Sequence, residues 1–394
     1  MKIVHVIPGL TRERGGTTAI VEGLVREQVA THEVTVLTTD QGARNGEQAS
    51  TLADGVRLVR SEVRGPDRWS YSPEFAALAA RELAACDLVQ VHTIFTYPSH
   101  VALRTAHRLG RPVVLTPAGV LHPYSLQKSR LIKAAYLARY GASIRRAVSA
   151  WHYASQAEAD QSWPHDRSPR FIVPYGVRPE QFRMSRPEAA AVVARLWPQL
   201  ADVPYVLFLS RLHRKKNVEF LVRQFLATAP GRGKLVVAGP DEENLWADIA
   251  RSLPAVAERV VRIPMVTGEA RTALLARATV FALSSEHENF GIVALEALAA
   301  GAPVLLSPHV DMAFAPELQR WVQVAPLEPQ AWQTALTAAL ARPLSTTDDG
   351  ELRAVIDRHY SWAAIARSMD DRYHWVLAGC PTVQPSALTT ALPS

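Results

Sequence analysis

The sequence predicts an α/β protein made of two doubly wound, parallel-sheet domains. The chain has 394 residues, which is too long for one ordinary hydrophobic core and favours two domains of roughly 150 to 200 residues each. Short apolar runs that end in glycine- or proline-containing loops alternate with stretches of helical periodicity, which is the pattern of βα units. A charged, proline-containing stretch at residues 178–187 suits a linker. We therefore expect domains at residues 1–180 and 181–358.

The composition is that of a soluble globular protein. It is 48% hydrophobic and 20% charged, and no run of about 18 apolar residues could span a bilayer. Residues 1–9 pass from a short apolar run into a glycine loop, so we interpret them as a first strand and not as a signal peptide, and we expect the chain to be cytoplasmic. Cys86 and Cys380 lie far apart and fit neither a disulfide framework nor a metal site.

The formal net charge of +6 favours anionic partners. Nucleotide diphosphates, lipid phosphates and the inner face of a membrane are the partners that this charge suits. Nucleic acid is not expected, because the sequence has no helix-turn-helix, zinc-finger or RNA-recognition signature.

The first half opens with a predicted βαβ unit. A strand at residues 2–7 precedes a glycine loop, a helix that Thr17 or Thr18 could cap, and an alternating, β-branched strand at residues 32–40. Gly15 and Gly16 are candidates for ligand contact, because glycine lets a backbone approach a ligand closely. The absence of a G-x-G-x-x-G motif argues against a dinucleotide dehydrogenase. The apolar face of the helix should comprise Ile20, Val21, Leu24, Val25 and Val29.

Two further strands carry site candidates at their carboxyl ends, where open α/β sheets bind ligands. The run at residues 86–92 ends in His92, and the run at residues 111–117 is closed by the turn Ala118-Gly119, with His122 three residues on. His92, Gly119 and His122 are therefore site candidates, although a lone histidine is as often structural.

Residues 128–151 have a long helical pattern with Lys133, Arg139, Arg145 and Arg146. A basic amphipathic helix would suggest membrane docking. At about 100° per residue, however, these charges spread around the helix and form no single face. We therefore expect a solvated helix that packs through its alanines and leucines.

The second half begins with a buried strand at residues 204–210 that runs directly into a basic loop. Four of the six residues from Arg211 to Lys216 are Arg or Lys. A second strand, at residues 234–240, ends in a turn at Gly239, and a helix at residues 265–278 leads into a third strand at residues 280–283. Helices are also expected at residues 329–341 and 361–376, and residues 381–394 should be a disordered tail.

The stretch at residues 284–307 reads SSEHENFGIVALEALAAGAPVLLS, and it predicts a loop, a helix and a strand. Such a unit places a helix N-terminus at the carboxyl edge of a parallel sheet, where its N–H groups and dipole favour a phosphate. Glu288 lies before this helix and Glu296 about two turns further on. Because carboxylates repel phosphates, these two side chains should face hydroxyl groups, as found at both ends of a nucleotide-sugar.

This stretch resembles the Glu-x(7)-Glu signature of the retaining family 4 glycosyltransferases, which have the GT-B fold. Residues 211–217 are similar to that family's Gly-Arg-Leu-x-x-x-Lys-Gly motif, with Ser210 and Asn217 in place of its glycines. Residues 15–38 resemble the family's opening, and residues 116–160 a branch that acts on bacterial cell-surface polysaccharides. Where that branch has a Pro-His-Gly turn near the reacting sugar, this chain has Pro117-Ala118-Gly119, and His122 could partly replace the missing histidine.

The resemblance implies two Rossmann-like domains facing across a cleft, with the terminal helix at residues 361–376 crossing back onto the first. It implies transfer of a hexosyl group, with retention, from a UDP- or GDP-sugar to a glycan or lipid-linked oligosaccharide acceptor in surface polysaccharide biosynthesis. Peripheral contact with the cytoplasmic membrane face fits such an acceptor. No cofactor is implied, and no metal, because no Asp-x-Asp pair is present.

The resemblance also assigns roles. Arg211 and Lys216 would clamp the diphosphate and stabilise the leaving group, while Glu288 would hold sugar hydroxyls and Glu296 the ribose. The further residues expected on the donor side are Gly15, Gly16, Gly239, Met265, Val266, Asn289, Phe290, Gly291 and Ile292. The residues expected on the acceptor side are His92, Gly119 and His122.

Two alternatives stay open, the epimerase and the scaffold protein, and a third, the phosphorylase, is disfavoured. A sugar-nucleotide epimerase shares this fold but needs acid and base residues that nothing here singles out. A glycan phosphorylase would be much longer and would bind pyridoxal phosphate through a lysine. A non-catalytic binding or scaffold protein is favoured by Ala118, whereas the intact set of Arg211, Lys216, Glu288 and Glu296 argues against it.

Overall fold

The computed structural model describes residues 1–11, 15–42, 46, 51–164, 168–228, 231, 233–253, 255–341 and 350–381. The chain divides into two compact units: unit 1 comprises Met1–Gly176 and Trp362–Ser394, and unit 2 comprises Val177–Ser361. The division falls at Val177, whose N–H donates to the Tyr360 carbonyl at 2.8 Å and which forms a parallel bridge with Ser361. Apart from residue 381, the expected tail lies outside the described residues.

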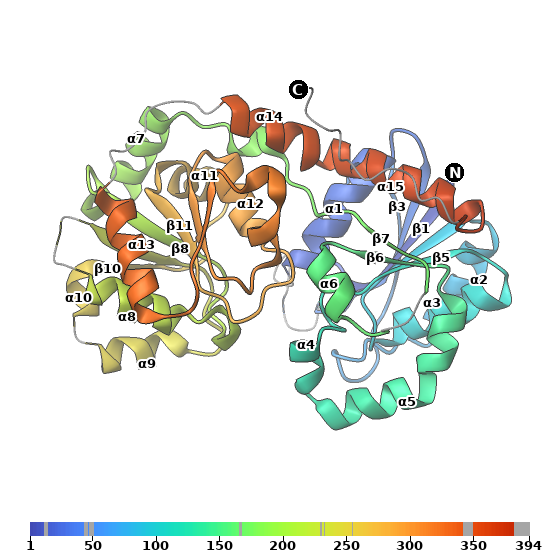
Figure 1. Cartoon of the computed structure of the whole chain (residues 1–394). Coiled ribbons are helices and arrows are strands. Elements are labelled where there is room, and N and C mark those ends of the chain that lie inside the picture. The colour runs from blue at the N-terminus through green and yellow to red at the C-terminus, as the bar shows by residue number, and fades with distance from the viewer. Residues whose placement is uncertain are drawn as a thin grey trace. The chain divides into compact units, whose positions relative to one another are not determined.

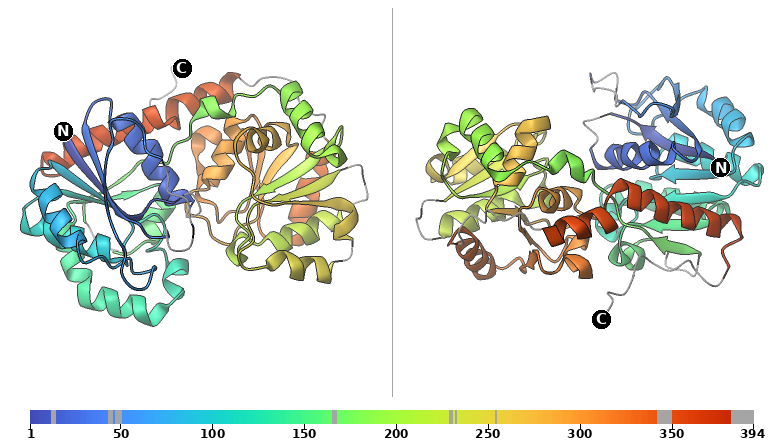
Figure 2. Two further views of the ribbon diagram at one scale, coloured as in Figure 1. Left: turned by 180° about the vertical axis from the view of Figure 1, so that it is seen from behind. Right: turned by 90° about the horizontal axis from the view of Figure 1, so that it is seen from above.

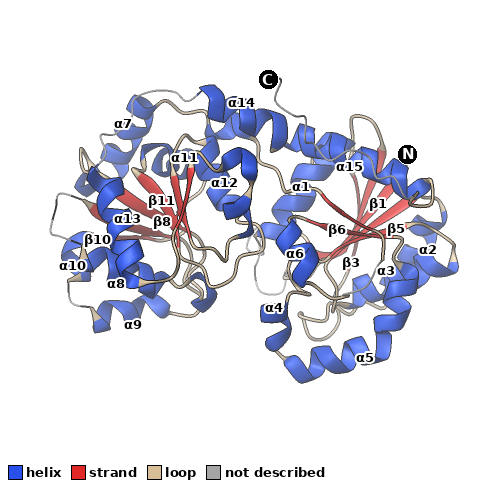
Figure 3. Cartoon of the chain, in the orientation of Figure 1, coloured by secondary structure: helices blue, strands red, loops and turns tan. Residues whose placement is uncertain are grey.

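Unit 1 is built on a seven-stranded sheet of order β3-β2-β1-β4-β5-β6-β7, in which every neighbouring pair is parallel. Helices flank the strands (Figures 1 and 3). The strands are β1 (Lys2–Gly9), β2 (Glu33–Thr39), β3 (Arg57–Ser61), β4 (Leu88–His92), β5 (Val113–Thr116), β6 (Ala150–Tyr153) and β7 (Arg170–Ile172). The helices are α1 (Gly16–Gln28), α2 (Phe75–Ala84), α3 (Tyr97–Arg108), α4 (Pro123–Gln127), α5 (Arg130–Ala147), α6 (Gln156–Gln161) and α15 (Trp362–Leu377).

Unit 2 has a six-stranded parallel sheet of order β10-β9-β8-β11-β12-β13, also flanked by helices. The strands are β8 (Tyr205–Leu209), β9 (Lys234–Ala238), β10 (Val260–Ile263), β11 (Val280–Leu283), β12 (Val304–Leu306) and β13 (Val322–Val324). The α-helices are α7 (Arg186–Leu196), α8 (Val218–Ala227), α9 (Leu245–Ser252), α10 (Val256–Arg259), α11 (Gly268–Arg277), α12 (Ile292–Ala299), α13 (Pro329–Ala341) and α14 (Gly350–His359). Short 3₁₀ turns are η3 (Pro179–Phe182), η4 (Pro198–Leu200), η5 (Arg214–Lys216), η6 (Asp311–Phe314) and η7 (Pro316–Leu318).

The prediction of two doubly wound α/β domains is therefore confirmed. Central strands such as β4, β5 and β8 are buried along their whole length, as expected where helices cover both faces of a parallel sheet. The strand order reverses between β1 and β4 in unit 1 and between β8 and β11 in unit 2. Ligands of open α/β sheets bind at the carboxyl ends of the strands at such reversals.

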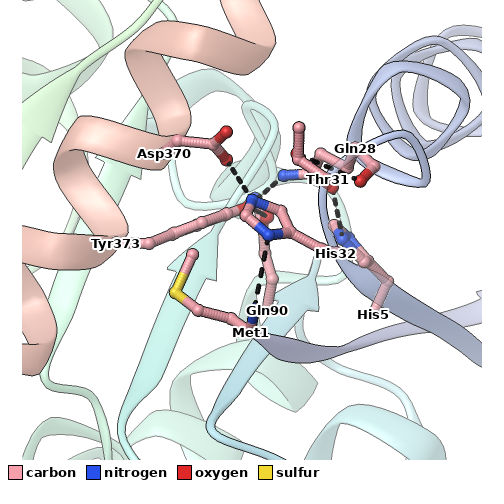
Figure 4. A network of polar contacts seen from close by, with 8 residues as sticks. All are labelled: Met1, His5, Gln28, Thr31, His32, Gln90, Asp370 and Tyr373. Atoms are coloured by element: carbon pink, nitrogen blue, oxygen red, sulfur yellow. Dashed lines mark hydrogen bonds and ion pairs between the residues drawn. The ribbon is translucent and has the colours of Figure 1, made fainter.

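The C-terminal helix α15 returns to unit 1 and packs against α1 (Figures 1 and 2). Gly23 makes this contact possible, because a Cβ at that position would lie 2.0 Å from the Trp362 ring. The hydroxyl of Tyr373 accepts a hydrogen bond from Gln28 Nε2 at 3.2 Å and donates to Gln90 Oε1. His32 Nε2 and Asp370 Oδ1 form a hydrogen bond at 2.9 Å (Figure 4).

Several local predictions were wrong. Neither Thr17 nor Thr18 caps α1, because the helix already begins at Gly16 and its N-cap is Gly15, with φ 67°. The expected linker at residues 178–187 contains the 3₁₀ turn η3 and the start of α7, whose capping box joins Ser185 and Glu188. Helix α14 was not predicted.

The long helix expected at residues 128–151 is also different in the structure. It begins at Arg130 and ends at Ala147, and Trp151 belongs to β6. Its inward side is formed by larger residues at helical spacing, while four of its alanines are exposed. The inward residues are Lys133, Tyr136, Leu137, Tyr140 and Ile144; the exposed alanines are Ala134, Ala135, Ala138 and Ala142. The expectation that alanines and leucines would pack this helix was therefore wrong for these four alanines, whereas Leu137 and Ala147 do pack inward.

Within the described ranges, no helix combines the length and the apolarity that a bilayer crossing requires.

Candidate functional site

The loops that follow β8 and β11 meet at the strand reversal of unit 2. The Ser284 hydroxyl, in the loop after β11, donates to the carbonyls of Lys216 at 3.3 Å and Asn217 at 3.0 Å. The Glu286 N–H donates to the Lys215 carbonyl at 2.8 Å. The basic loop is thereby fixed against the loop that carries the first glutamate of the predicted pair.

The basic loop also has its own local support. His213 caps the 3₁₀ turn η5, where its Nδ1 accepts from the Lys215 N–H at 3.1 Å. Asn217 adopts a left-handed conformation, with φ 51°, and precedes the first residue of α8. Asparagine tolerates this conformation better than most residues, which explains how it can stand where the resembled motif has glycine.

Lys216 and Glu288 form an ion pair between Nζ and Oε2. Their side chains are 12% and 16% exposed, so the pair is largely shielded from water but still reachable. Burial, reinforced by the neighbouring cations Lys215 and Arg211, lowers the pKa of the Lys216 ammonium well below its ordinary value. An additional negative charge at this point, such as a phosphate, would therefore favour the protonated lysine.

Backbone contacts hold Glu288 in place. Its N–H donates to the His309 carbonyl at 2.9 Å, and the residue forms a parallel bridge with Val310. Sequence analysis assigned Lys216 to phosphate and Glu288 to hydroxyls; the structure brings the two together as partners. A ligand that binds both Lys216 and Glu288 would replace the contact between these two side chains by contacts with the ligand.

Helix α12 begins directly after this pair. Its N-cap, Gly291, has φ 91°, and a Cβ there would lie 2.8 Å from Val310 Cγ1, so glycine is required at this position. No side chain caps the helix and no acidic residue occupies its first turn, where Ile292 is the first residue. Its N-terminal N–H groups are therefore suited to an anion. Phe290 is buried and packs as part of the core, while Asn289 is partly exposed.

Glu296, on α12, forms an ion pair with Arg271 on α11. The side chains are 17% and 22% exposed, respectively, and the Arg271 guanidinium also lies 5.8 Å from the centre of the Phe182 ring. Arg271 was not among the predicted site residues, because no motif marks it and its partner lies 25 residues away. The contact with Arg271 orients the Glu296 carboxylate.

The other donor-side candidates in unit 2 lie less deeply. Arg211 is exposed, and its Nη1 lies 4.0 Å from Glu242 Oε2. Met265 is 55% exposed and Val266 is partly buried. Gly239 follows β9, and a Cβ there would lie 2.0 Å from the Ser210 carbonyl oxygen, so its glycine is needed for backbone packing.

In unit 1, β1 and β4 are neighbours at the strand reversal, and α1 is the first helix after β1. Gly15 and Gly16 lie at the start of α1, and a Cβ built on either glycine would meet no atom within 4 Å. Part of the preceding loop, residues 12–14, lies outside the described residues.

His92 is fully buried and belongs to a hydrogen-bonded network inside unit 1. Its Nε2 lies 3.0 Å from His5 Nδ1, and His5 Nε2 lies 2.9 Å from Gln28 Oε1. Because Gln28 uses its amide N–H₂ on Tyr373, its oxygen accepts from His5 (Figure 4). A neutral His5 then accepts from His92 through Nδ1. The expectation that His92 lies at an open edge was wrong.

The network continues through the sheet beyond Tyr373. Gln90 Nε2 donates to the Thr116 hydroxyl at 3.0 Å, and Thr116 lies 3.0 Å from His152 Nδ1. His152 Nε2 donates to the Val173 carbonyl at 2.8 Å. Burial lowers the pKa of His5 and of His152 to about 4, and burial with the nearby His5 lowers that of His92. All three rings are therefore neutral near pH 7.

The turn after β5 has a left-handed backbone at Ala118, with φ 52°, and at Gly119. The Gly119 N–H donates to the buried Glu158 carboxylate at 2.7 Å. His122 is the N-cap of α4: its Nδ1 accepts from the Tyr124 N–H at 3.2 Å, and its Nε2 lies 2.6 Å from Gln161 Oε1. Both ring nitrogens are engaged, so His122 could replace the missing turn histidine only by giving up a contact.

The described residues contain no group of three or more His, Cys, Asp or Glu side chains arranged to hold a metal ion.

Two family profiles match the chain and together span most of it. Residues 15–176 match the profile "Glycosyl transferase 4-like domain", and residues 203–342 match "Glycosyl transferases group 1". The two matches lie in unit 1 and unit 2, respectively.

Two curated relatives and a solved structure are similar to this chain. The chain is 27% identical to the GDP-mannose:cellobiosyl-diphosphopolyprenol alpha-mannosyltransferase of Xanthomonas campestris, over 98% of this chain and 99% of that protein. It is 31% identical to the D-inositol 3-phosphate glycosyltransferase of Mycobacteroides abscessus, over 45% of this chain and 41% of that protein. The crystal structure of Anabaena HepE in complex with UDP and glucose matches with a TM-score of 0.74 and 16% identity, covering 95% and 99% of the two chains, which shows the fold.

Proposed function

The chain belongs to the family 4, or group 1, glycosyltransferases of GT-B fold, and we propose that it moves a hexose from a nucleoside-diphosphate donor to a lipid-linked glycan with retention of anomeric configuration. The donor occupies the strand reversal of unit 2, and the acceptor is bound by unit 1. Product formation contributes to surface polysaccharide biosynthesis on the cytoplasmic side of the membrane.

The contact between Lys216 and Glu288 carries this proposal. A nucleotide-sugar has a diphosphate next to sugar hydroxyls. The diphosphate suits the Lys216 ammonium, and the sugar hydroxyls suit the Glu288 carboxylate. The uncapped N-terminus of α12 lies directly after Glu288 and suits the same diphosphate. Glu296, held by Arg271, then binds the ribose hydroxyls.

Full-length relatives support a guanine nucleotide as the first donor to test. Mannosyltransferases from Xanthomonas campestris and Komagataeibacter xylinus, both named as using GDP-mannose, match over 96% or more of this chain. The HepE structure contains UDP and glucose, so a UDP-sugar is the second donor to test.

The reaction breaks the bond between the sugar C1 and the diphosphate oxygen and forms a bond from C1 to an acceptor hydroxyl on the same face. The departing phosphate oxygen takes the acceptor proton, so no separate base is required. Lys216 and Arg211 stabilise the charge that develops on the diphosphate. At ~4 Å and an effective dielectric constant of about 20, each such contact has a gross attraction of about 4 kcal/mol before desolvation. We expect this stabilisation to act without a metal or a cofactor.

The acceptor proposal rests on the same relatives. The Xanthomonas campestris protein is named as acting on a cellobiosyl-diphosphopolyprenol, so we propose a diphosphate-linked glycan on a polyprenyl chain. The turn at Gly119 and the cap residue His122 are the acceptor-side candidates that stay nearest the carboxyl edge of the unit 1 sheet.

A second function, glycan or nucleotide binding without transfer, is favoured by one observation. Ala118 stands where the resembled branch has a histidine, and both ring nitrogens of His122 are engaged. A scaffold of this kind would bind the nucleotide and release no product.

A transfer assay tests the proposal. The protein is incubated with GDP-mannose or UDP-glucose and a polyprenyl-diphosphate-linked disaccharide, in EDTA or in magnesium, and the product's anomeric configuration is read by NMR. We expect an α-linked product in EDTA. Lys216→Ala should form no product, and Arg214→Ala, at an exposed residue of the same loop, should form it like the wild type. Nucleotide binding without product from any donor would favour the scaffold, and an epimerised nucleotide-sugar formed without acceptor would favour an epimerase.

A further inference from the structure

The segment from Leu88 to Ala157 concentrates the positive charge of the chain. Of the 43 Lys and Arg residues in the sequence, nine lie in these 70 residues, and none of the 37 Asp and Glu residues does. The remainder of the chain, with 34 cationic against 37 anionic residues, is slightly acidic. The net positive charge therefore belongs to one part of unit 1, which contains α3, α4 and α5.

Helix α5 presents an unusual surface within this segment. Every exposed residue of the helix is arginine, leucine, isoleucine or alanine. These residues are Arg130, Leu131, Ile132, Ala134, Ala135, Ala138, Arg139, Ala142, Arg145 and Arg146. A solvated helix usually carries mixed charges or polar groups on its outer side, and this one has neither a carboxylate nor an amide there.

The most exposed large apolar side chains lie at the start of α5. Leu131 is 81% exposed and Ile132 is 65% exposed, more than any other large hydrophobic residue among those described. Tyr124, on α4, is 36% exposed, and Lys128 and Arg130 on either side of the connecting Ser129 are exposed as well. Figure 1 shows α4 and α5 along the lower rim of unit 1.

The inner side of α5 packs against unit 1. The first half of α5 lies on an aromatic cluster, in which Tyr136 is 5.2 Å from Phe95 and 5.1 Å from Tyr140, between ring centres. Lys133 points inward, where its ammonium lies 5.5 Å from the Phe95 ring and donates to the Ser125 carbonyl at 2.5 Å. Because Lys133 and the tyrosines fix the inner side, Leu131 and Ile132 cannot turn into the core.

We propose that the outer face of α4 and α5 docks the protein on an anionic lipid bilayer. Leu131 and Ile132 enter the boundary between headgroups and acyl chains, Tyr124 lies at headgroup level, and Lys128, Arg130 and Arg139 contact lipid phosphates. The small alanines let the helix axis lie close to the surface, and the long arginines reach the phosphates around them. Nucleic acid fits less well, because exposed aliphatic side chains neither stack on bases nor donate to their edges.

Vesicle flotation with the full chain tests this docking. Vesicles of phosphatidylcholine alone are compared with vesicles containing about 30% phosphatidylglycerol, at salt from about 0.05 M to about 0.5 M. We expect flotation with the anionic vesicles only, weakened by salt. Leu131→Asp/Ile132→Asp should lower the partition coefficient at least tenfold, and Lys128→Gln/Arg130→Gln about fivefold for each charge removed.

The matched control is Leu196→Asp/Leu377→Asp, which changes the net charge equally at leucines that are 43% and 40% exposed elsewhere. It should float like the wild type. Equal flotation of the Leu131→Asp/Ile132→Asp variant and the wild type would overturn the proposal, as would the absence of flotation with anionic vesicles. Binding of a nucleic acid duplex that depends on Lys128 and Arg130, without vesicle binding, would also overturn it.

The docking surface does not depend on the donor assignment. Each variant is therefore also assayed for nucleotide binding and for transfer to a water-soluble glycan. We expect both to equal those of the wild type, because neither Leu131 nor Ile132 belongs to the candidate site.

Discussion

The two strand reversals of this chain are built in opposite ways. In unit 2, the polar groups are charged and paired, Lys216 with Glu288 and Arg271 with Glu296, and every member remains partly reachable by solvent. In unit 1, His5, His92 and His152 are fully buried, neutral and joined through amides and hydroxyls.

The difference separates exchangeable contacts from structural ones. In a partly exposed ion pair, a ligand can replace one member if it carries the same charge as that member. The displaced side chain is then solvated by water, so little buried polar surface is left unpaired. A buried neutral network cannot do so without exposing several unpaired donors and acceptors. The unit 2 reversal is therefore suited to bind a charged ligand, and the unit 1 network to fix β1, β4, α1 and α15 to one another.

Acid should affect the unit 1 network most. His5 and His152 have folded-state pKa values of about 4, below the ordinary 6.5, so the unfolded chain binds more protons below pH 6.5. Their stabilisation is fully present above pH 6.5 and is lost as the pH falls from 6.5 to 4, on the order of 3 kcal/mol for each histidine. Urea unfolding at successive pH values measures this loss.

A histidine variant supplies the control for acid unfolding. Replacing the exposed His107 by Gln should leave the pH dependence unchanged, whereas His152→Gln should flatten it. A pH profile of the free energy of unfolding that stays flat between pH 6.5 and 4.5 would show that burial does not lower the pKa values of His5 and His152.

Removing the charge of Glu288 should have the next largest effect. Glu288→Gln should lower the transfer rate by about 100- to 1000-fold, since the carboxylate that binds the sugar hydroxyls is lost. Binding of the free nucleoside diphosphate should persist, because Lys216 no longer has a competing carboxylate. The exposed Glu286→Gln is the control, and an equal loss in both variants would contradict a specific role for Glu288.

Tyr373→Phe tests the network from the side of α15. The variant leaves Gln28 Nε2 and Gln90 Oε1 without their buried partner and should destabilise unit 1 by about 2 kcal/mol. Tyr71→Phe, at a tyrosine that is 40% exposed, should change the free energy of unfolding by less than about 0.5 kcal/mol. Equal stability of the two variants would mean that the Tyr373 hydroxyl does not hold the helix.

The smallest effect is expected at Arg271. Arg271→Gln removes the partner that orients Glu296 and should weaken nucleoside diphosphate binding about tenfold, or about 1.4 kcal/mol. Calorimetric titration measures it, with the exposed Arg195→Gln as the control. Unchanged binding in Arg271→Gln would remove the ribose role from this pair.

The sequence predicted β1, β2, β4, β5, β8, β9, β11 and β12 and the unit 2 loops because each of these features is local, whereas β3, β6, β10 and β13 were not predicted. A buried apolar run that ends in a polar, charged or glycine-containing loop is enough to place β8, β9 and β11 and the loops that follow them. The start of α12 is likewise marked by Gly291, where the backbone conformation and Val310 permit only glycine.

The failures concern contacts between distant residues. The alanines of α5 have a helical pattern that cannot tell the inner side from the outer; the aromatic cluster around Phe95 and Tyr136 decides it. His92 was expected at an open edge of the sheet. Its burial depends on a network that includes His5 and Tyr373, and Tyr373 lies 281 positions later in the chain. Arg271 could not be foreseen, since only folding brings α11 to α12.

The most direct test of the account is calorimetric titration of GDP and UDP, in EDTA, into the wild type, Lys216→Ala and Arg214→Ala. We expect the wild type and Arg214→Ala to bind one of the two nucleotides with equal affinity without metal, and Lys216→Ala to bind it at least about 30-fold more weakly. Equal binding by Lys216→Ala and the wild type would contradict the central claim that the Lys216–Glu288 pair is the donor site.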